Sequence, residues 1–153
     1  MNTAQRVILK EKLEELAIHI DAKTHRKNDP VSLVWSYQEP QDQELAALVA
    51  ASVAYGQVAL VRDAGKRIMQ PLGPSPMETL QSLSNDDLYA IYNDYVYRMT
   101  RGEDVVDMLC GIRDMVKEFG SLKEGYLAQQ GETHLEKASG WIQDLRSRRV
   151  IKI

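Results

Sequence analysis

The sequence has few of the residues that hold proteins together covalently or through metals. With only one cysteine, Cys110, in 153 residues, no internal disulfide can form. Only three histidines occur (His19, His25 and His134), without His-Glu-x-x-His or Cys-x-x-Cys spacing, so we predict no metal site. Cys110 ends the apolar run Met108-Leu109-Cys110, which favours a buried small side chain over a reactive thiol.

The chain also lacks an excess of positive charge and any long apolar run. It carries 19 Lys and Arg against 22 Asp and Glu, a net charge of −3. This balance argues against nucleic-acid binding through overall charge, but it leaves room for a local basic face. No segment approaches the roughly 20 apolar residues that span a bilayer, and the charged N-terminus is unlike a signal peptide. We therefore expect no membrane contact and a cytoplasmic location.

Sequence motifs of catalysis are missing as well. Neither a Gly-x-x-x-x-Gly-Lys-Ser/Thr phosphate loop nor a Gly-x-Ser-x-Gly elbow occurs. The acidic groups Asp86-Asp87 and Glu103-Asp104 fall at expected helix starts, where capping accounts for them. We therefore identify no catalytic residue and expect no cofactor. Among the functions considered, an enzyme with its own small-molecule site has the least support.

Helical periodicity runs through the whole chain. Leu9, Leu13, Leu16 and Ile20 recur at spacings that stack them on one face of a helix over 4–27, which Asn28-Asp29-Pro30 ends. Period-two alternation is absent, so we predict an all-α protein, a single domain over 1–153 built as a compact orthogonal bundle of about seven or eight helices. Residues 31–38 are expected to form a loop on the core, with room for one helical turn. Further helices are expected at 40–54, 57–70, 76–82, 85–93, 103–119, 121–130 and 133–148.

The stretch from Pro40 to Gly73 stands at the centre of this arrangement. Residues 45–54 are nearly all small or apolar, which predicts a helix covered on most sides and ended by Tyr55-Gly56. The next helix carries a broad basic stripe made of Arg62, Lys66 and Arg67. A glycine turn, a helix N-terminus and a basic stripe together favour phosphate contact; the alternative is an ordinary solvated face with Asp63 as partner. The tyrosines at 89–97 either stack bases or pack at the edge of the core.

The same stretch resembles a known family. The pattern consists of Asp42-x-Glu44-Leu45-Ala46-Ala47, Ala50-Ala51-x-x-Ala54-Tyr55-Gly56 and Pro71-Leu72-Gly73, with Asp29-Pro30 before it and Tyr97-Arg98 after it. Over 29–120 it resembles the uncharacterised bacterial family called domain of unknown function 2400. More distantly, the layout is similar to helix-hairpin-helix DNA glycosylases, although Ala54 and Tyr55-Gly56 stand where those enzymes carry Gln and a Thr-Asp pair.

These resemblances imply a glycosylase-like helical domain that contacts DNA. The family continues into a second half with Arg-Trp-Met-Val-Arg and Pro-Leu-Asp-Thr-His stretches that this sequence does not contain, which implies a shortened member or a fragment, inactive as a catalyst on its own. The expected DNA contacts are Tyr55, Gly56, Gln57, Arg62, Lys66, Arg67 and Arg98. The alternative is a helical interaction module that docks a partner protein, or a second copy of itself, through an apolar C-terminal surface of Trp141, Ile142, Val150, Ile151 and Ile153.

Overall fold

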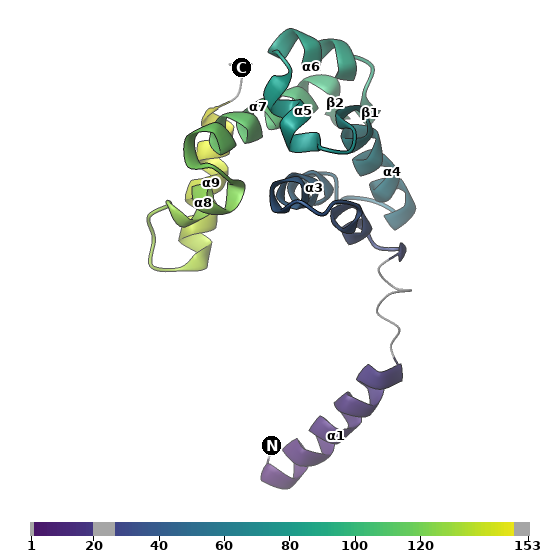
Figure 1. Cartoon of the computed structure of the whole chain (residues 1–153). Helices are drawn as coiled ribbons and strands as arrows, with labels where there is room; N and C mark the ends of the chain where they lie inside the picture. Colours follow the sequence, from purple (N-terminus) through teal and green to yellow (C-terminus); the bar gives the residue numbers. More distant parts are fainter. Residues whose placement is uncertain (1, 20–26, 149–153) are drawn as a thin grey trace.

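The computed structural model describes residues 2–19 and 27–148 and confirms that the protein is all-α, with one very short hairpin (Figure 1). The predicted first helix is present over Thr3–His19, and its continuation over 20–26 lies outside the described residues. The elements in order are α1 (Thr3–His19), the 3₁₀ helix η1 (Pro30–Ser36), α3 (Pro40–Ser52), α4 (Val58–Met69), the 3₁₀ helix η2 (Gln70–Leu72), α5 (Pro76–Ser82), α6 (Asn85–Tyr92), β1 (Val96–Tyr97), β2 (Thr100–Arg101), α7 (Gly102–Phe119), α8 (Leu122–Leu127) and α9 (His134–Ser147).

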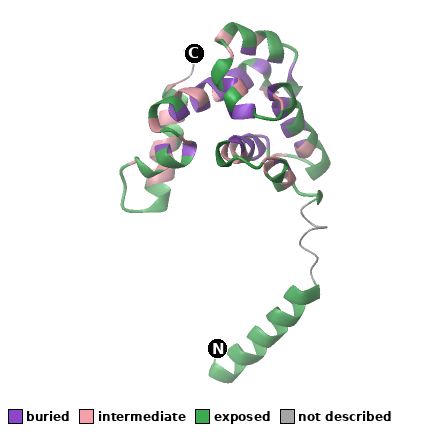
Figure 2. Cartoon of the chain, viewed as in Figure 1, coloured by how far each residue is buried: buried purple, intermediate pink, exposed green. Residues whose placement is uncertain are grey.

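Helices α3 and α7 supply the centre of the core. Leu45, Ala46 and Val49 of α3 are fully buried, and α7 buries residues along its whole length. Figure 2 shows these buried residues gathered where α3, α4, α5, α6 and α7 meet. The prediction that α3 is covered on most sides was wrong, because Ala47 and Ser52 are exposed on its other face. An alanine-rich sequence predicts close packing, yet it does not tell how many neighbours a helix has.

The first turn of α3 ties three other elements together. The Gln41 side-chain amide donates to the Gly120 carbonyl at 2.6 Å, at the end of α7. The Asp42 carboxylate, 5% exposed, accepts from the Met77 backbone N–H of α5 at 2.8 Å. Glu44 accepts from the backbone N–H groups of Leu122 and Lys123 at 2.8 and 3.3 Å. Since the amides of a first helical turn lack partners within their own helix, α3 caps both α5 and α8.

Helices α8 and α9 extend from α7 as an arm, whereas α1 stands away from the rest of the chain (Figure 1). α9 has no fully buried residue, although Trp141 and Leu145 pack against the core. It approaches α7 closely at Gly111, where a β-carbon would lie 2.9 Å from the Leu145 carbonyl oxygen. None of the residues of α1 is buried (Figure 2). The arm therefore rests on α7, and α1 makes no contribution to the core.

The tyrosine-rich segment after α6 turns into the core, as the packing alternative predicts. The Tyr92 hydroxyl donates to the Ile68 carbonyl at 2.6 Å, and the Tyr95 hydroxyl donates to the Ala64 carbonyl at 3.2 Å. Both rings are buried against α4. The chain then forms the antiparallel β1–β2 hairpin, in which Val96 pairs with Arg101 and Tyr97 with Thr100. Arg98 occupies the turn with a φ of 53°.

Replacement of Gly102 by alanine tests the tight join between the hairpin and α7. A β-carbon at Gly102 would lie 1.9 Å from the Tyr92 carbonyl oxygen, which belongs to the backbone and has no free space to move into. We expect G102A to lower the free energy of unfolding by about 3 kcal/mol in urea titration. Gly120, where nothing lies within 4 Å, is the control, since G120A carries only the cost of its φ of 88°. Equal losses for the two variants would contradict this account.

Burial of the tyrosines also predicts the alkaline limit of stability. Burial raises the pKa of Tyr95 to about 12 and that of Tyr92 further still. The unfolded chain therefore loses these phenolic protons first, near pH 10, and the stability that they contribute falls as the pH rises from about 10 towards 12. Urea unfolding between pH 9 and 11.5 should show a shallower decline for Y95F than for the parent chain. The same decline in both would rule out Tyr95 as a cause.

Candidate nucleic-acid interface

The turn that follows α3 meets the β1–β2 hairpin. The Tyr97 hydroxyl donates to the Tyr55 carbonyl at 2.6 Å, across 42 residues of sequence. The two rings lie 5.1 Å apart between centroids, tilted by 37°. The Tyr55 hydroxyl is hydrogen-bonded to the Thr100 hydroxyl. These contacts fix the turn and the hairpin to each other, so the surface that they form is built before any ligand arrives.

Gly56 lies at the point of closest approach. Its φ of 122° is one that residues with a β-carbon rarely adopt. A β-carbon there would also lie 2.8 Å from Arg98 Nη1 and 3.0 Å from the Tyr97 hydroxyl. The glycine thus allows the Arg98 guanidinium to rest over the turn, one residue before Gln57, the N-cap of α4. Arg98 remains exposed, as does Gln57.

Two more arginines surround the hairpin. Arg67 of α4 donates from Nη1 to the Val96 carbonyl at 3.3 Å, and its guanidinium lies 4.9 Å from the centroid of the Tyr95 ring. This cation–π contact holds the Arg67 side chain against the hairpin. Arg101 pairs with Val96 across the strands, and its backbone N–H donates to Asp104 at 2.8 Å. We call Arg67, Arg98 and Arg101 the hairpin arginines; all three are exposed.

The structure divides the predicted basic stripe of α4. Arg62 and Lys66 line a seam beside η1, where Pro30, Ser32 and Leu33 form the other wall. Arg67 points to the hairpin instead, because five residues of α-helix turn the side chain by about 140° whereas four turn it by about 40°. The Nε atom of Arg62 is buried without a hydrogen-bond partner in the described part of the structure. Of the seven predicted DNA contacts, Tyr55, Gly56, Gln57, Arg67 and Arg98 come together at the hairpin.

Thr100 and Arg101 belong to this surface and were not among the predicted contacts. The signal for them was the neighbouring Tyr97-Arg98 pair, from which only Arg98 was predicted as a contact. Nothing in the local sequence shows that this pair folds back on residues 55–56, because the contact depends on the hairpin and on the path of α6. Tyr97 was likewise not among the predicted contacts, although its hydroxyl joins the hairpin to the turn through the Tyr55 carbonyl.

The remaining residues that could carry chemistry are the cysteine and the possible metal ligands. Cys110 is buried as predicted, and burial is the main cause that raises the pKa of its thiol, which keeps it in the unreactive form. Over residues 2–19 and 27–148, no three His, Cys, Asp or Glu side chains are arranged to hold a metal ion. In the same ranges, none of the helices is both long and apolar enough to cross a membrane.

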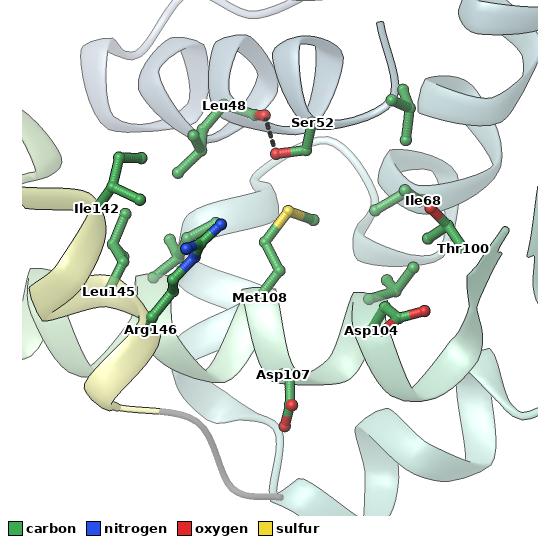
Figure 3. Close-up of a pocket in the computed structure, with 13 residues that line it drawn as sticks. Leu48, Ser52, Ile68, Thr100, Asp104, Asp107, Met108, Ile142, Leu145 and Arg146 are labelled. Atoms are coloured by element: carbon green, nitrogen blue, oxygen red, sulfur yellow. Dashed lines mark hydrogen bonds between the residues drawn. The ribbon is translucent and has the colours of Figure 1, made fainter. Parts of the chain in front are cut away.

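The predicted apolar C-terminal surface is present in part. Trp141 and Ile142 border an open space between α3 and the arm, while Val150, Ile151 and Ile153 lie outside the described residues. A cavity of about 350 Å³ lies there, and Figure 3 shows residues that line it, among them Leu48 and Ser52 of α3, Met108 of α7, and Ile142 and Leu145 of α9. None of the hairpin arginines lines this cavity, but Thr100 and Asp104 next to Arg101 do, as does Arg146 of α9.

Comparison with known proteins places most of the chain in one family. The family model described as "Protein of unknown function (DUF2400)" matches residues 29–150. No curated protein and no solved structure matches the chain. The matched range contains the whole hairpin surface and excludes α1. The similarity in layout to DNA glycosylases stays a prediction.

Substitution of Gly56 tests whether Arg98 depends on this turn. We expect G56A to reduce the free energy of unfolding by about 2 kcal/mol, from the cost of the unusual φ and the contact with Nη1. In an R98A background the contact is gone, so the same change should cost about 1 kcal/mol less. Urea titration of the four proteins gives this coupling. Strictly additive losses would show that Gly56 and Arg98 act separately.

Proposed function

Since the chain belongs to the DUF2400 family of proteins of unknown function, we propose its function from its own surface: it binds the phosphate backbone of duplex DNA through the hairpin arginines. The observation that carries this proposal is the approach of Arg98 to Gly56, which holds a guanidinium over the turn that begins α4. The two segments that meet there, Tyr55-Gly56 and Tyr97-Arg98, are also the ones on which the family resemblance rests.

The chemistry of the surface suits a phosphodiester. Guanidinium groups present planar arrays of N–H donors that match phosphate oxygens, and they remain charged at every physiological pH. The N-terminus of α4, which begins after the N-cap Gln57, adds a partial positive charge. Because Arg67 is held against the hairpin, less side-chain freedom is lost when it binds.

The proposal is contact with the DNA backbone and not recognition of a base sequence. The described surface has a short hairpin with arginines around it, and no helix stands out from it as a probe for the major groove. Contacts to phosphate position a protein on DNA without selecting a sequence. The chain as a whole carries more acid than base, so the interaction should be weak and strongly dependent on salt.

Fluorescence anisotropy with a labelled DNA duplex, titrated at several salt concentrations between about 50 and 200 mM, tests the proposal. For the parent chain we expect the logarithm of the affinity to fall linearly with the logarithm of salt. R98A should weaken binding to all sequences alike and lower the magnitude of the salt slope by about one, because one phosphate contact is lost. R67A should act in the same direction.

The control is K117A, which removes one positive charge from an exposed position near the other end of α7. It changes the net charge as R98A does and should leave affinity and salt slope unchanged. Equal effects of K117A and R98A would reduce the interaction to overall charge. An absence of binding by the parent chain at the lowest salt would disprove the proposal outright.

A further inference from the structure

Helix α3 leaves one face open towards the arm. Two neighbouring cavities of about 350 and 370 Å³ lie along this face, and both are lined by Leu48. Helix α3 forms one wall of this space, α7 lies beneath it, and α8 and α9 form the other wall (Figure 3). We call this space the α3–α9 groove. On the α3 side it is lined by Glu44, Ala47, Leu48 and Ser52, and on the arm side by Tyr126, Trp141, Ile142 and Leu145.

The dimensions of the groove suit an α-helix. Its α3 wall, from Glu44 to Ser52, is about 12 Å long at 1.5 Å per residue. Ala47 presents a small side chain, which lets another helix approach to the usual 8–10 Å between axes.

The chain itself contains a helix without a packing partner. Helix α1 has no buried residue, and Leu13 and Leu16 are 55% and 57% exposed. Leu9, Leu13 and Leu16 form a stripe that is about 10 Å long, close to the length of the groove wall. Arg6 and Lys12 border this stripe on either side, whereas Glu11, Glu14 and Glu15 lie on the other side of the helix.

Pairing of α1 with another α1 would be weak. In heptad positions Leu9 and Leu16 fall at d and Leu13 at a, which places Arg6 in the seam and Lys10 and Lys12 at the flanking e and g positions. Pairing of two α1 helices is disfavoured, because the leucine seam is short, contains a positive charge and is flanked by further positive charges. The groove supplies the apolar surface that a second α1 does not, and among its lining residues the acids Glu44, Asp104 and Asp107 outnumber the bases Lys123 and Arg146.

We propose that α1 of a second copy of this chain docks in the α3–α9 groove, its leucine stripe inward. Reciprocal exchange gives a closed two-fold dimer in which both grooves are filled and both helices are covered. Two grooves and two helices double the buried surface, which moves the contact towards the roughly 1,600 Å² of a stable interface. The inference does not rest on DNA binding, since none of the hairpin arginines lines the groove, although Thr100 and Asp104 beside Arg101 do.

Light scattering of the full chain after size exclusion tests the inference. At high protein concentration we expect twice the 17.4 kDa mass of the chain. L13E on the stripe and I142E in the groove, where Ile142 is 39% exposed, should each give monomers. An equimolar mixture of the two variants should recover a weaker dimer at high concentration, because the intact α1 of I142E can dock in the intact groove of L13E and restore one of the two contacts.

Two matched controls place the same new charge outside the contact. Ile18 is 82% exposed on the face of α1 away from the stripe, and Leu135 is 80% exposed on α9 outside the groove. I18E and L135E should both remain dimers, with circular dichroism confirming the fold of all four variants. If the parent chain is a monomer at high concentration, the inference is wrong, and this holds also if α1 docks in the groove of its own chain. The inference is equally wrong if L13E or I142E, each measured by itself, still forms dimers, or if mixing the two variants recovers none.

Discussion

The acceptors in the first turn of α3 are the contacts on which the arrangement of the helices depends. Short helices such as α5 and α8 cannot hold themselves together, because most of their backbone N–H groups lie in the first turn and have no partner there. Asp42 and Glu44 supply those partners, the second across 78 residues of sequence. One turn of one helix thus fixes both the α5 side of the core and the base of the arm.

The attachment of α8 to Glu44 also explains why one face of α3 is left uncovered. Because Glu44 holds the start of α8, the arm is attached to α3 at that helix's N-terminal end. Towards Ser52 a cavity lies between the arm and α3, and α7 forms most of its floor. The open face of α3 is therefore a consequence of how the arm is anchored. At the far end of α3, the Tyr55-Gly56 turn is closed by the hairpin instead, so the two ends of one helix carry two different surfaces.

The sequence predicted the helices well and their contacts poorly. Apolar spacing and the punctuation by Pro30, Gly56 and Gly120 indicated every α-helix of the described structure within a few residues, because these signals are local. The short helix at Pro30–Ser36 was expected as a loop on the core with at most a helical turn. The Asp42-x-Glu44 pair was noticed as part of a family pattern. Its capping of distant helices had no local signal, since that role needs partners far along the chain.

At the candidate interface, too, the sequence indicated residues but not their contacts. Gly56 and Arg98 were both predicted as contacts, yet the sequence around them does not reveal that the glycine makes room for the guanidinium. Arg62, Lys66 and Arg67 were read as one stripe because spacing along a helix was considered without the elements packed around it. Once η1 covers one flank and the hairpin the other, the helix has two basic edges with different neighbours. Which cations can act together is therefore decided by tertiary packing, and here it selects the arginines that surround the hairpin.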